Sequence, residues 1–246
     1  MAFQTVFKRY ELKYMLTLEQ KEKVLKAMEP YMELDKYGRT TIRNLYYDTD
    51  TYLLIRRSIE KPAYKEKLRV RSYTQADSDS MVFVELKKKY KHVVYKRRVS
   101  LTEKTAMEWL SGQESGVPQM QISDEVEYFL DYYKTLRPMA FLSYEREAYY
   151  AKDESDFRVT FDDTILCREN DLSLQSKVYG TSILPDGMVL MEIKCSGGIP
   201  LWMTQVLSEE QIYKTSFSKY GTMYKQLIFP KLQRNTLNKM EVKAYA

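Results

Sequence analysis

The sequence predicts one α+β domain in which a large antiparallel sheet or barrel carries a few helices on its outside. Apolar and polar residues alternate at period two in about seven segments, as in strands with two different faces. Helical spacing is confined to a few segments between them, and the sequence contains neither G-x-x-x-x-G-K-[ST] nor G-x-G-x-x-G. With 246 residues, 44% of them apolar, the chain can bury a core, and we expect residues 1–246 to form a single domain.

Seven strands are predicted from this alternation. In one of them, Val82 and Val84 lie on an apolar face, whereas Glu85 and Lys87 point the other way. In another, a shift of register by one residue would invert the face, so the position of Arg98 depends on that register. In chain order, the predicted strands are 9–14, 67–73, 81–89, 92–100, 141–150, 156–163 and 191–195.

Helices are predicted between the strands from their starting residues and their apolar spacing. Thr17 and Gln20 form a capping box ahead of an apolar face that runs from Leu18 to Met32. A weaker helix is expected over 102–110. The other predicted starts are Ser123, followed by Val126, Leu130 and Tyr133 at helical spacing, and Ser208 with Gln211.

The composition excludes several classes of protein. No stretch approaches ~18 consecutive apolar residues and the first residues lack a signal-peptide core, so we expect a cytoplasmic protein without a membrane span. Cys167, Cys195 and His92 are too few for a disulfide framework, a Cys/His zinc site or a histidine-dependent triad. Cys195 is expected in the core and His92 without a function. A net charge of +5 is too small to indicate a nucleic-acid partner.

The charged faces of the predicted strands are strongly basic, and two explanations are open. Each face simply meets solvent, as antiparallel sheets commonly allow, or the faces line a common interior. A solvated face normally mixes signs, because like charges directly across a ladder destabilise it. If the sheet closes with its apolar faces outward, its interior is lined by Arg9, Lys13, Arg69, Arg71, Lys87, Lys96, Arg98, Arg146, Arg158 and Lys194.

Such an interior requires an anion of comparable charge. An eight-stranded barrel has room for one small ligand, and a linear polyphosphate has oxygens that match the guanidinium fork. Glu11, Glu85 and Glu192 would repel this ligand unless they pair with lysines or hold a divalent metal. Mg²⁺ and Mn²⁺ bind through carboxylates together with substrate phosphates. The residues therefore predict a basic tunnel for a polyanion with a metal, and they leave the reaction open.

Nine short motifs follow one another over nearly the whole chain. They are R-x-E-x-K-Y at 9–14, LYYDT at 45–49, KLRVR at 67–71, VELKKK at 84–89, YKRRV at 95–99, SYEREAY at 143–149, FRVTFD at 157–162, MEIK at 191–194 and SKYG at 218–221. In this order they resemble the VTC (vacuolar transporter chaperone) domain, the polyphosphate polymerase branch of the CYTH or triphosphate tunnel metalloenzyme superfamily.

The resemblance implies an eight-stranded antiparallel tunnel that holds triphosphate or polyphosphate with Mn²⁺ or Mg²⁺. It implies that Lys219 lies near the transferred group and that Glu192 binds the metal, with Glu11 as a second candidate ligand. Catalytic roles are expected for Lys219, Glu192 and Arg146. The expected phosphate-binding residues are Lys13, Arg69, Arg71, Lys87, Lys96, Tyr144, Arg146, Arg158, Ser218 and Lys219, and the basic faces add Arg98 and Lys194.

The expected activity is transfer of the γ-phosphate of ATP to a growing polyphosphate chain. The wider superfamily has E-x-E-x-K in its first strand, and Arg9 replaces the first of these acids, which favours the polymerase branch. Tyr46, Tyr47 and Asp48 are expected to serve packing and turn formation. Two alternatives need the same basic wall: a triphosphatase acting on inorganic or nucleoside triphosphate, and a polyphosphate- or nucleotide-binding module without catalysis.

Overall fold

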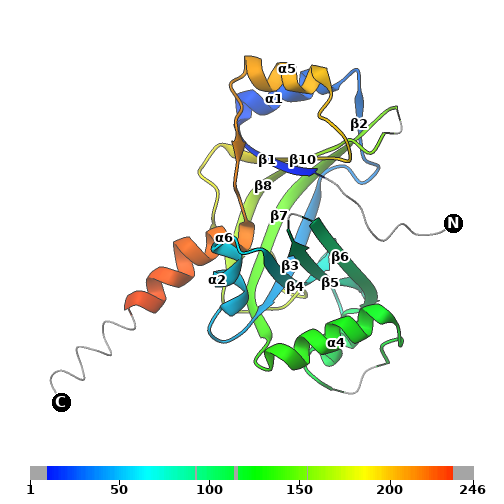
Figure 1. The fold of residues 1–246 in the computed structure, drawn as a ribbon, viewed down its shortest axis with the longest axis vertical. Coiled ribbons are helices and arrows are strands. Elements are labelled where there is room, and N and C mark those ends of the chain that lie inside the picture. Colours follow the sequence, from blue (N-terminus) through cyan, green and yellow to red (C-terminus); the bar gives the residue numbers. More distant parts are fainter. Residues whose placement is uncertain (1–9, 92, 114–115, 154, 235–246) are drawn as a thin grey trace.

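The computed structural model describes residues 10–91, 93–113, 116–153 and 155–234, so Arg9 and His92 lie outside the described residues. All strands of the described chain belong to one antiparallel sheet (Figure 1). Its strands are β1 (Tyr10–Thr17), β2 (Met32–Leu34), β3 (Thr40–Asp48), β4 (Tyr64–Ser72), β5 (Met81–Tyr90), β6 (Val93–Thr102), β7 (Arg137–Ala151), β8 (Arg158–Arg168), β9 (Thr181–Ser182), β10 (Met188–Cys195) and β11 (Lys214–Thr215).

The sheet is open, so the prediction of a closed eight-stranded barrel is wrong in strand number and in closure. The eleven strands follow the order β11-β1-β10-β8-β7-β3-β4-β5-β6, while β2 pairs with β7 and β9 pairs with β8. In Figure 1, the long strands β7 and β8 connect β1 and β10 above to β4, β5 and β6 below. Near the two ends of this path, Lys87 on β5 contacts Glu11 on β1 at 3.2 Å. Charged side chains thus meet where a barrel would have backbone pairing.

We call this junction between β1 and the β4–β5 pair the seam. The segment after β11 crosses it, because the Lys13 ammonium donates to the Phe217 carbonyl at 3.0 Å from the β1 side. From the β4 side, Lys67 donates to the Ser218 hydroxyl at 3.1 Å. The seam is therefore closed by side chains of both sheet ends and by one crossing segment.

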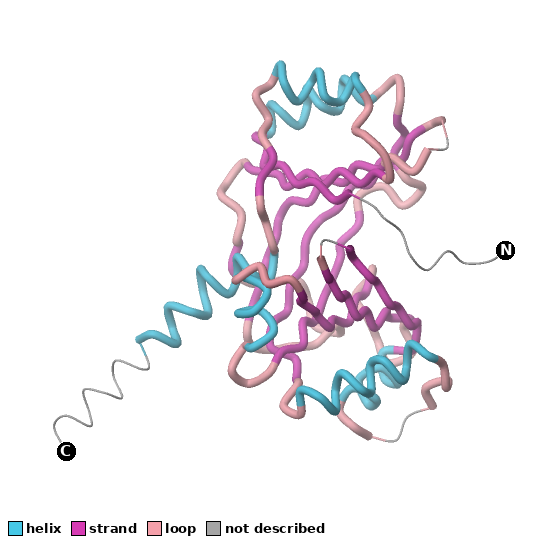
Figure 2. Tube along the Cα trace, viewed as in Figure 1, coloured by secondary structure: helices cyan, strands magenta, loops and turns pink. Residues whose placement is uncertain are grey.

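Helices cover the outer faces of both ends of the sheet (Figure 2). The helices α1 and α5 pack together over β1, β8 and β10, and α3 and α4 pack over β4, β5 and β6. None of the helices in the described ranges combines the length and hydrophobicity that a membrane crossing requires. Their bounds are α1 (Leu18–Met28), α2 (Leu53–Ile59), α3 (Glu103–Leu110), α4 (Gln121–Tyr133), α5 (Leu201–Glu209) and α6 (Lys219–Met223), followed by a π-helical turn at Tyr224–Ile228.

Two of the predicted helix starts are confirmed and two need correction. Thr17 caps α1 with a complete capping box, and Thr102 caps α3. The structure begins α4 after Met120, and Ser123 instead donates to the Pro118 carbonyl from within the first turn. Ser208 lies in the last turn of α5, which ends at Glu209, and its hydroxyl donates back to the Thr204 carbonyl. A hydroxyl that bonds backward along a helix is indistinguishable in sequence from one that caps forward.

The apolar faces of the strands point outward under the helices, as the alternation predicts. Leu68, Val84 and Leu86 are fully buried in one core with α3 and α4. Val159 and Ile193 are fully buried in a second core with α1 and α5, and Cys195 lies beside them. Because side chains alternate along a strand, the charged residues of these strands must point to the opposite side, away from the helices.

Asp48, at the end of β3, is hydrogen-bonded both to α2 and to α6 (Lys219–Met223), which we call the plug helix. Its carboxylate is completely buried and accepts hydrogen bonds from the backbone N–H groups of Leu54 (2.8 Å) and Ile55 (3.0 Å). The Tyr220 hydroxyl of α6 donates to the same carboxylate at 3.2 Å. Asp48 therefore satisfies free N–H groups at the start of α2 and ties them to α6, which confirms its expected turn role.

We predict that Asp48→Ala lowers the free energy of unfolding by roughly 3 kcal/mol, because several buried donors lose their acceptor. Asp50→Ala is the matched control, since Asp50 is exposed and, among the described residues, accepts a side-chain hydrogen bond only from the Thr135 hydroxyl. The control should change stability by less than about 0.5 kcal/mol. Urea unfolding curves of both variants measure the difference, and equal effects would contradict the anchoring role of Asp48.

Candidate functional site

The side chains that point away from the outer helices form a surface with a charged part and an apolar part under α6, which we call the inner face. Strand registers place its residues directly across from one another on eight neighbouring strands. Thirteen cations there face four carboxylates. The cations are Lys13, Lys65, Lys67, Arg69, Arg71, Lys87, Lys89, Lys96, Arg98, Arg146, Arg158 and Lys194, with Lys219 from α6, and the carboxylates are Glu11, Glu85, Asp162 and Glu192.

Glu85 on β5 is the centre of the largest cation cluster. Its side chain is 1% exposed, and its oxygens lie 2.8 Å from Arg69, 2.8 Å from Lys96 and 2.8 Å from Arg98 Nε, with Arg71 at 3.9 Å. Burial opposes ionisation of this carboxyl, but these cations outweigh it and hold its pKa far below the ordinary value. One buried acid therefore fixes four cations, and the observed register places Arg98 on the inner face as predicted.

Asp162 on β8 is the centre of a second cluster beside the plug helix. It is completely buried and accepts two hydrogen bonds from the Arg146 guanidinium, at 2.6 and 2.7 Å. Lys219, the first residue of α6, donates to Asp162 at 2.5 Å. Burial raises the pKa of Asp162, yet Lys219 and Arg146 together lower it below the ordinary value. Asp162 thus holds two of the predicted catalytic cations next to each other.

Two tyrosine hydroxyls of the inner face accept hydrogen bonds from arginines of the Glu85 cluster. Tyr144 is 3% exposed, and its hydroxyl accepts a hydrogen bond from Arg71 at 3.1 Å. The Lys219 ammonium lies over the Tyr144 ring, 4.2 Å from the ring centre. Tyr46 accepts from Arg69 at 3.0 Å, and its ring stacks on Tyr220 of the plug helix. Although burial favours the neutral phenol, Arg69 and neighbouring cations lower the pKa of Tyr46 to about 8. Tyr46 therefore packs as expected, against Tyr220, and in addition contacts a cation of the inner face.

Glu192 on β10 and Glu11 on β1 form the acidic end of the inner face. The Lys13 ammonium lies between them, 3.6 Å from Glu11 and 3.8 Å from Glu192, and Lys194 lies 2.8 Å from Glu192. Burial raises the pKa of Glu192, but Lys194 and Lys13 outweigh it and keep the pKa well below its ordinary value. Burial also raises the pKa of Glu11, but Lys87 and Lys13 bring it below its ordinary value, so both carboxylates are charged at neutral pH.

This pair of carboxylates fits a hard divalent cation only in part. Lys13 occupies the position between Glu11 and Glu192 in which one cation would contact both acids. Mg²⁺ and Mn²⁺ commonly use one or two carboxylates and complete their shell with water and substrate phosphates. Within the described ranges, no group of three or more acidic, histidine or cysteine side chains is arranged for a metal. The donor set therefore suits Mg²⁺ or Mn²⁺ together with phosphate oxygens, and not a metal held by protein alone.

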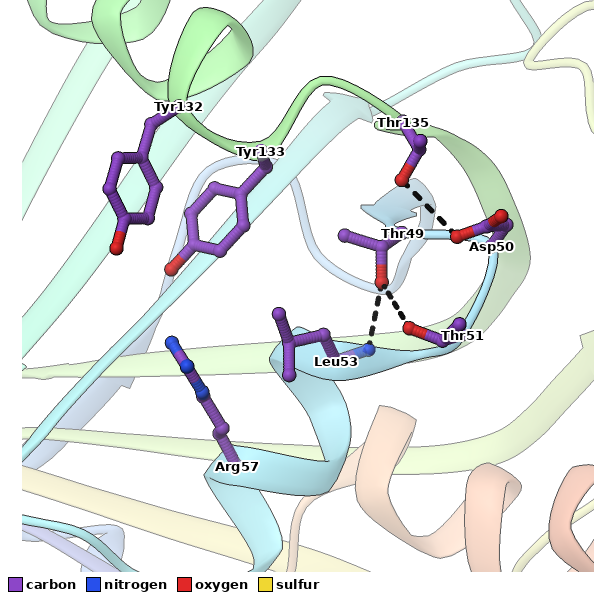
Figure 3. Close-up of a pocket in the computed structure, with 8 residues that line it drawn as sticks. All are labelled: Thr49, Asp50, Thr51, Leu53, Arg57, Tyr132, Tyr133 and Thr135. Carbon is purple, nitrogen blue, oxygen red and sulfur yellow. Dashed lines mark hydrogen bonds between the residues drawn. The ribbon is translucent and has the colours of Figure 1, made fainter.

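A separate surface pocket lies between α2 and the end of α4 (Figure 3). Its volume is about 310 Å³, and none of the inner-face residues lines it. The Thr49 hydroxyl already accepts from the Leu53 N–H at 3.0 Å, and the Thr135 hydroxyl donates to Asp50 at 3.2 Å. These groups satisfy one another, and we assign no ligand to this pocket.

Comparison with known proteins connects the inner face to a family. No curated protein matches this chain closely enough to serve as a relative. The model of the VTC domain matches residues 8–228, which include every described strand, α6 and the π-helical turn that follows it. The chain belongs to the VTC domain family. This membership indicates an enzyme of the triphosphate tunnel class.

Several solved structures are similar to this VTC domain. A Bacillus halodurans protein provisionally described as an adenylate cyclase has a TM-score of 0.54 and 13% identity, covering 87% of this chain and 96% of that chain. Another is HpAC1 from Hippeastrum, described as an adenylyl cyclase candidate with a dominant triphosphatase activity. It has a TM-score of 0.49 and 14% identity, covering 87% of this chain and 94% of that chain. The first likeness shows a shared fold.

The structure brings together the residues predicted for the VTC site, although their roles remain predictions. Ten of the predicted cations lie on the inner face, and Tyr144 and Ser218 contact cations of that face. Arg158 differs from the rest, since it has no carboxylate partner among the described residues. Its guanidinium instead lies 4.6 Å from the Tyr150 ring centre.

Sequence reasoning missed Lys67 and Asp162 as site residues. Lys67 has the same parity as Arg69 and Arg71 within the KLRVR motif, so the alternation already placed it on the inner face. Asp162 has the same parity as Arg158, but a carboxylate amid predicted phosphate ligands gave no reason to include it. Its role is visible only from its bonds to Arg146 and Lys219.

We predict a pH-dependent stability contribution from Lys67. Burial lowers the pKa of Lys67 from 10.5 to about 8, although Tyr46 opposes the shift. Between these two pH values the unfolded chain binds more protons at this site than the folded chain, so this contribution to stability rises with pH. Lys67→Met should therefore raise the melting temperature most at pH 7, with a difference from wild type that shrinks toward pH 10.

Thermal unfolding scans from pH 7 to pH 10 measure this difference. Lys104→Met is the control, because Lys104 on α3 is exposed and lies far from the inner face. The control difference should not change with pH. A Lys67→Met difference that is constant across the range would show that burial does not shift the pKa of Lys67.

Proposed function

We propose that this VTC domain binds inorganic polyphosphate along its inner face and extends it with the γ-phosphate of ATP, releasing ADP. The family supports an enzyme of the triphosphate tunnel class, and one observation favours a polymeric anion over a short one. It is a group of lysines on three adjacent strands, which we call the lysine ladder: Lys65, Lys67, Lys87, Lys89 and Lys96.

The lysine ladder sets like charges directly opposite one another. Lys67 pairs across β4 and β5 with Lys87, which in turn pairs with Lys96 on β6, and Lys65 pairs with Lys89. Such pairs destabilise a sheet unless an anion lies over them. The ladder continues outward from the half-buried Arg69 and the buried Arg71 toward solvent, where Lys87 and Lys96 are 41% and 44% exposed.

The protein itself compensates only part of the lysine ladder. Among the described residues, only Lys87 and Lys96 have carboxylate partners. Lys67 and Lys65 donate to neutral serine oxygens, at 3.1 and 3.2 Å. A linear polyphosphate carries negative charge on every phosphate and would cover both the arginines and the ladder. A triphosphate is too short to neutralise both, which is why the ladder favours polyphosphate.

The chemistry proposed for this site depends on positioning and charge neutralisation. Phosphoryl transfer passes through a loose transition state with its charge spread over oxygens, so the protein contributes mainly fixed cations. Asp162 holds Arg146 and Lys219 in place by hydrogen bonds of 2.5–2.7 Å. We assign to Lys219 the stabilisation of charge that develops on the transferred group. An ionised phosphate acceptor needs no general base.

Glu192, with Glu11 as second ligand, would hold Mn²⁺ or Mg²⁺ in this proposal. A bound metal ion supplies charge neutralisation at phosphate oxygens that several amino-acid cations cannot reach together. Lys13 and Lys194, which now pair with Glu192, would then be free to contact the phosphate chain. Glu192 and Glu11 would therefore pair with lysines in the free protein and with the metal ion in the phosphate-bound protein.

We predict that Glu192→Gln lowers metal-dependent turnover on the order of 10²-fold or more, because the metal stabilises transition-state charge. Purified protein is incubated with ATP and Mn²⁺ and the products are resolved on a gel, where wild type should form long chains. The variant should still bind polyphosphate through the inner-face arginines. Glu147→Gln is the control, since Glu147 pairs with Lys21 on the outer side of β7.

Each other product pattern would point to a different activity. Release of phosphate without chains would identify a triphosphatase, and binding without turnover would identify a binding module. Near-normal turnover of Glu192→Gln, with circular dichroism confirming the fold, would remove Glu192 from the metal site. In that case Glu11 would be the next carboxylate to test.

We further predict that Lys89→Ala weakens binding of long polyphosphate by roughly two- to fivefold, the effect of one partly exposed charge. Binding of tripolyphosphate should hardly change, because Lys89 lies at the outer end of the lysine ladder. Lys88→Ala provides the control, since Lys88 is adjacent in sequence but pairs with Glu125 on the outer side. Calorimetric titrations at fixed salt compare them, and equal losses for both chain lengths would contradict an extended binding surface.

A further inference from the structure

Two buried polar atoms on β8 have no hydrogen-bond partner among the described residues and lie on the inner face. They are the hydroxyl of Thr160 and Nε of Arg158, two positions apart on the same strand. Thr160 is 1% exposed. Buried polar groups are nearly always hydrogen-bonded, and an unsatisfied group costs roughly 1–3 kcal/mol, so a pair of them side by side calls for an explanation.

The neighbours of Thr160 leave its hydroxyl without a protein acceptor. Across the sheet it faces Glu192 on β10 and Ala148 on β7. Ala148 has no polar atom, and the carboxylate of Glu192 is directed to Lys194 and Lys13 instead. The hydroxyl therefore points into the inner face between an occupied acid and a methyl group.

Arg158 provides the charge that the hydroxyl lacks. It faces Lys194 on β10 and Tyr150 on β7. No carboxylate in the described chain pairs with Arg158, whereas every other predicted arginine of the inner face contacts Glu85 or Asp162. An arginine without an acid, a lysine across from it and a free hydroxyl two residues along together form a site for an anion.

We infer that Thr160 is a phosphate-binding residue, whose hydroxyl donates to a phosphate oxygen held by Arg158 and Lys194. This inference rests on the proposed function, because it assigns one more contact to the same inner face. In the free protein Thr160 is buried directly across from Glu192. When a phosphate draws Lys13 and Lys194 away from Glu192, it reaches the Thr160 hydroxyl and satisfies it.

This role makes a prediction that a structural role does not. Thr160→Val keeps the shape of the side chain and removes only the hydroxyl. The variant should be as stable as wild type or more so, because an unsatisfied buried group has been removed. Its affinity for tripolyphosphate should nevertheless fall on the order of tenfold, the loss of one hydrogen bond to a charged group. Thr160→Ser should retain most of the affinity.

The chain offers a matched control in Ser143 on β7. Its hydroxyl is also completely buried and also lacks a hydrogen-bond partner within the described ranges. Ser143 faces Arg43 on the outer side of the sheet, away from the inner face. Ser143→Ala should therefore leave tripolyphosphate affinity unchanged.

The experiment is a calorimetric titration of tripolyphosphate into the full-length protein and the three variants, in EDTA and again with Mn²⁺, with melting temperatures measured alongside. A loss for Thr160→Val in both conditions, absent from Ser143→Ala, is the expected result. Unchanged affinity of Thr160→Val, or a loss that appears only with Mn²⁺, would overturn the direct phosphate contact while leaving the proposed function intact. Failure of wild-type protein to bind tripolyphosphate would overturn both.

Discussion

The excess of positive charge on the inner face is the constraint on which the rest of this structure depends. The thirteen cations of the described residues cannot share one surface unless acids or a ligand offset their repulsion. Glu85 and Asp162 provide this at the centre by fixing six of the cations between them. Because the two acids are almost completely buried, they fix the geometry of the cations rather than merely cancelling their charge.

The outer layer of the protein follows from the same constraint. Since the polar side chains point inward, the apolar sides of the strands need cover, and four helices provide it in two separate cores. The plug helix differs, because it enters the inner side and packs Tyr220 and Met223 against apolar residues of β3 and β7. The boundary between the apolar and the charged part of the inner face therefore lies at Ser218 and Lys219, where α6 begins.

Much of this arrangement could be predicted from alternation alone. Parity along each strand placed Arg69, Arg98 and Arg158 on one surface, and the structure agrees. The alternation could not predict that the sheet stays open. Closure depends on whether strands seven places apart in the sheet form backbone hydrogen bonds, and the pattern within one strand does not report this. The clusters around Glu85 and Asp162 were equally hidden, since a pattern tells which face an acid is on and not which cations reach it. That the Thr160 hydroxyl lacks a hydrogen-bond partner in the described part of the chain can be seen only in the structure.

The seam has a consequence for how a polymer is loaded. A fully hydrogen-bonded barrel would admit a long chain only by threading one of its ends. Here Lys87 with Glu11, Lys13 with the Phe217 carbonyl and Lys67 with Ser218 close the gap without a strand ladder. These contacts are made by the same ammonium groups that would turn to phosphate. If the inner face binds polyphosphate as proposed, an anion that approaches the seam from the side would compete directly with these contacts, and the middle of a chain could enter laterally.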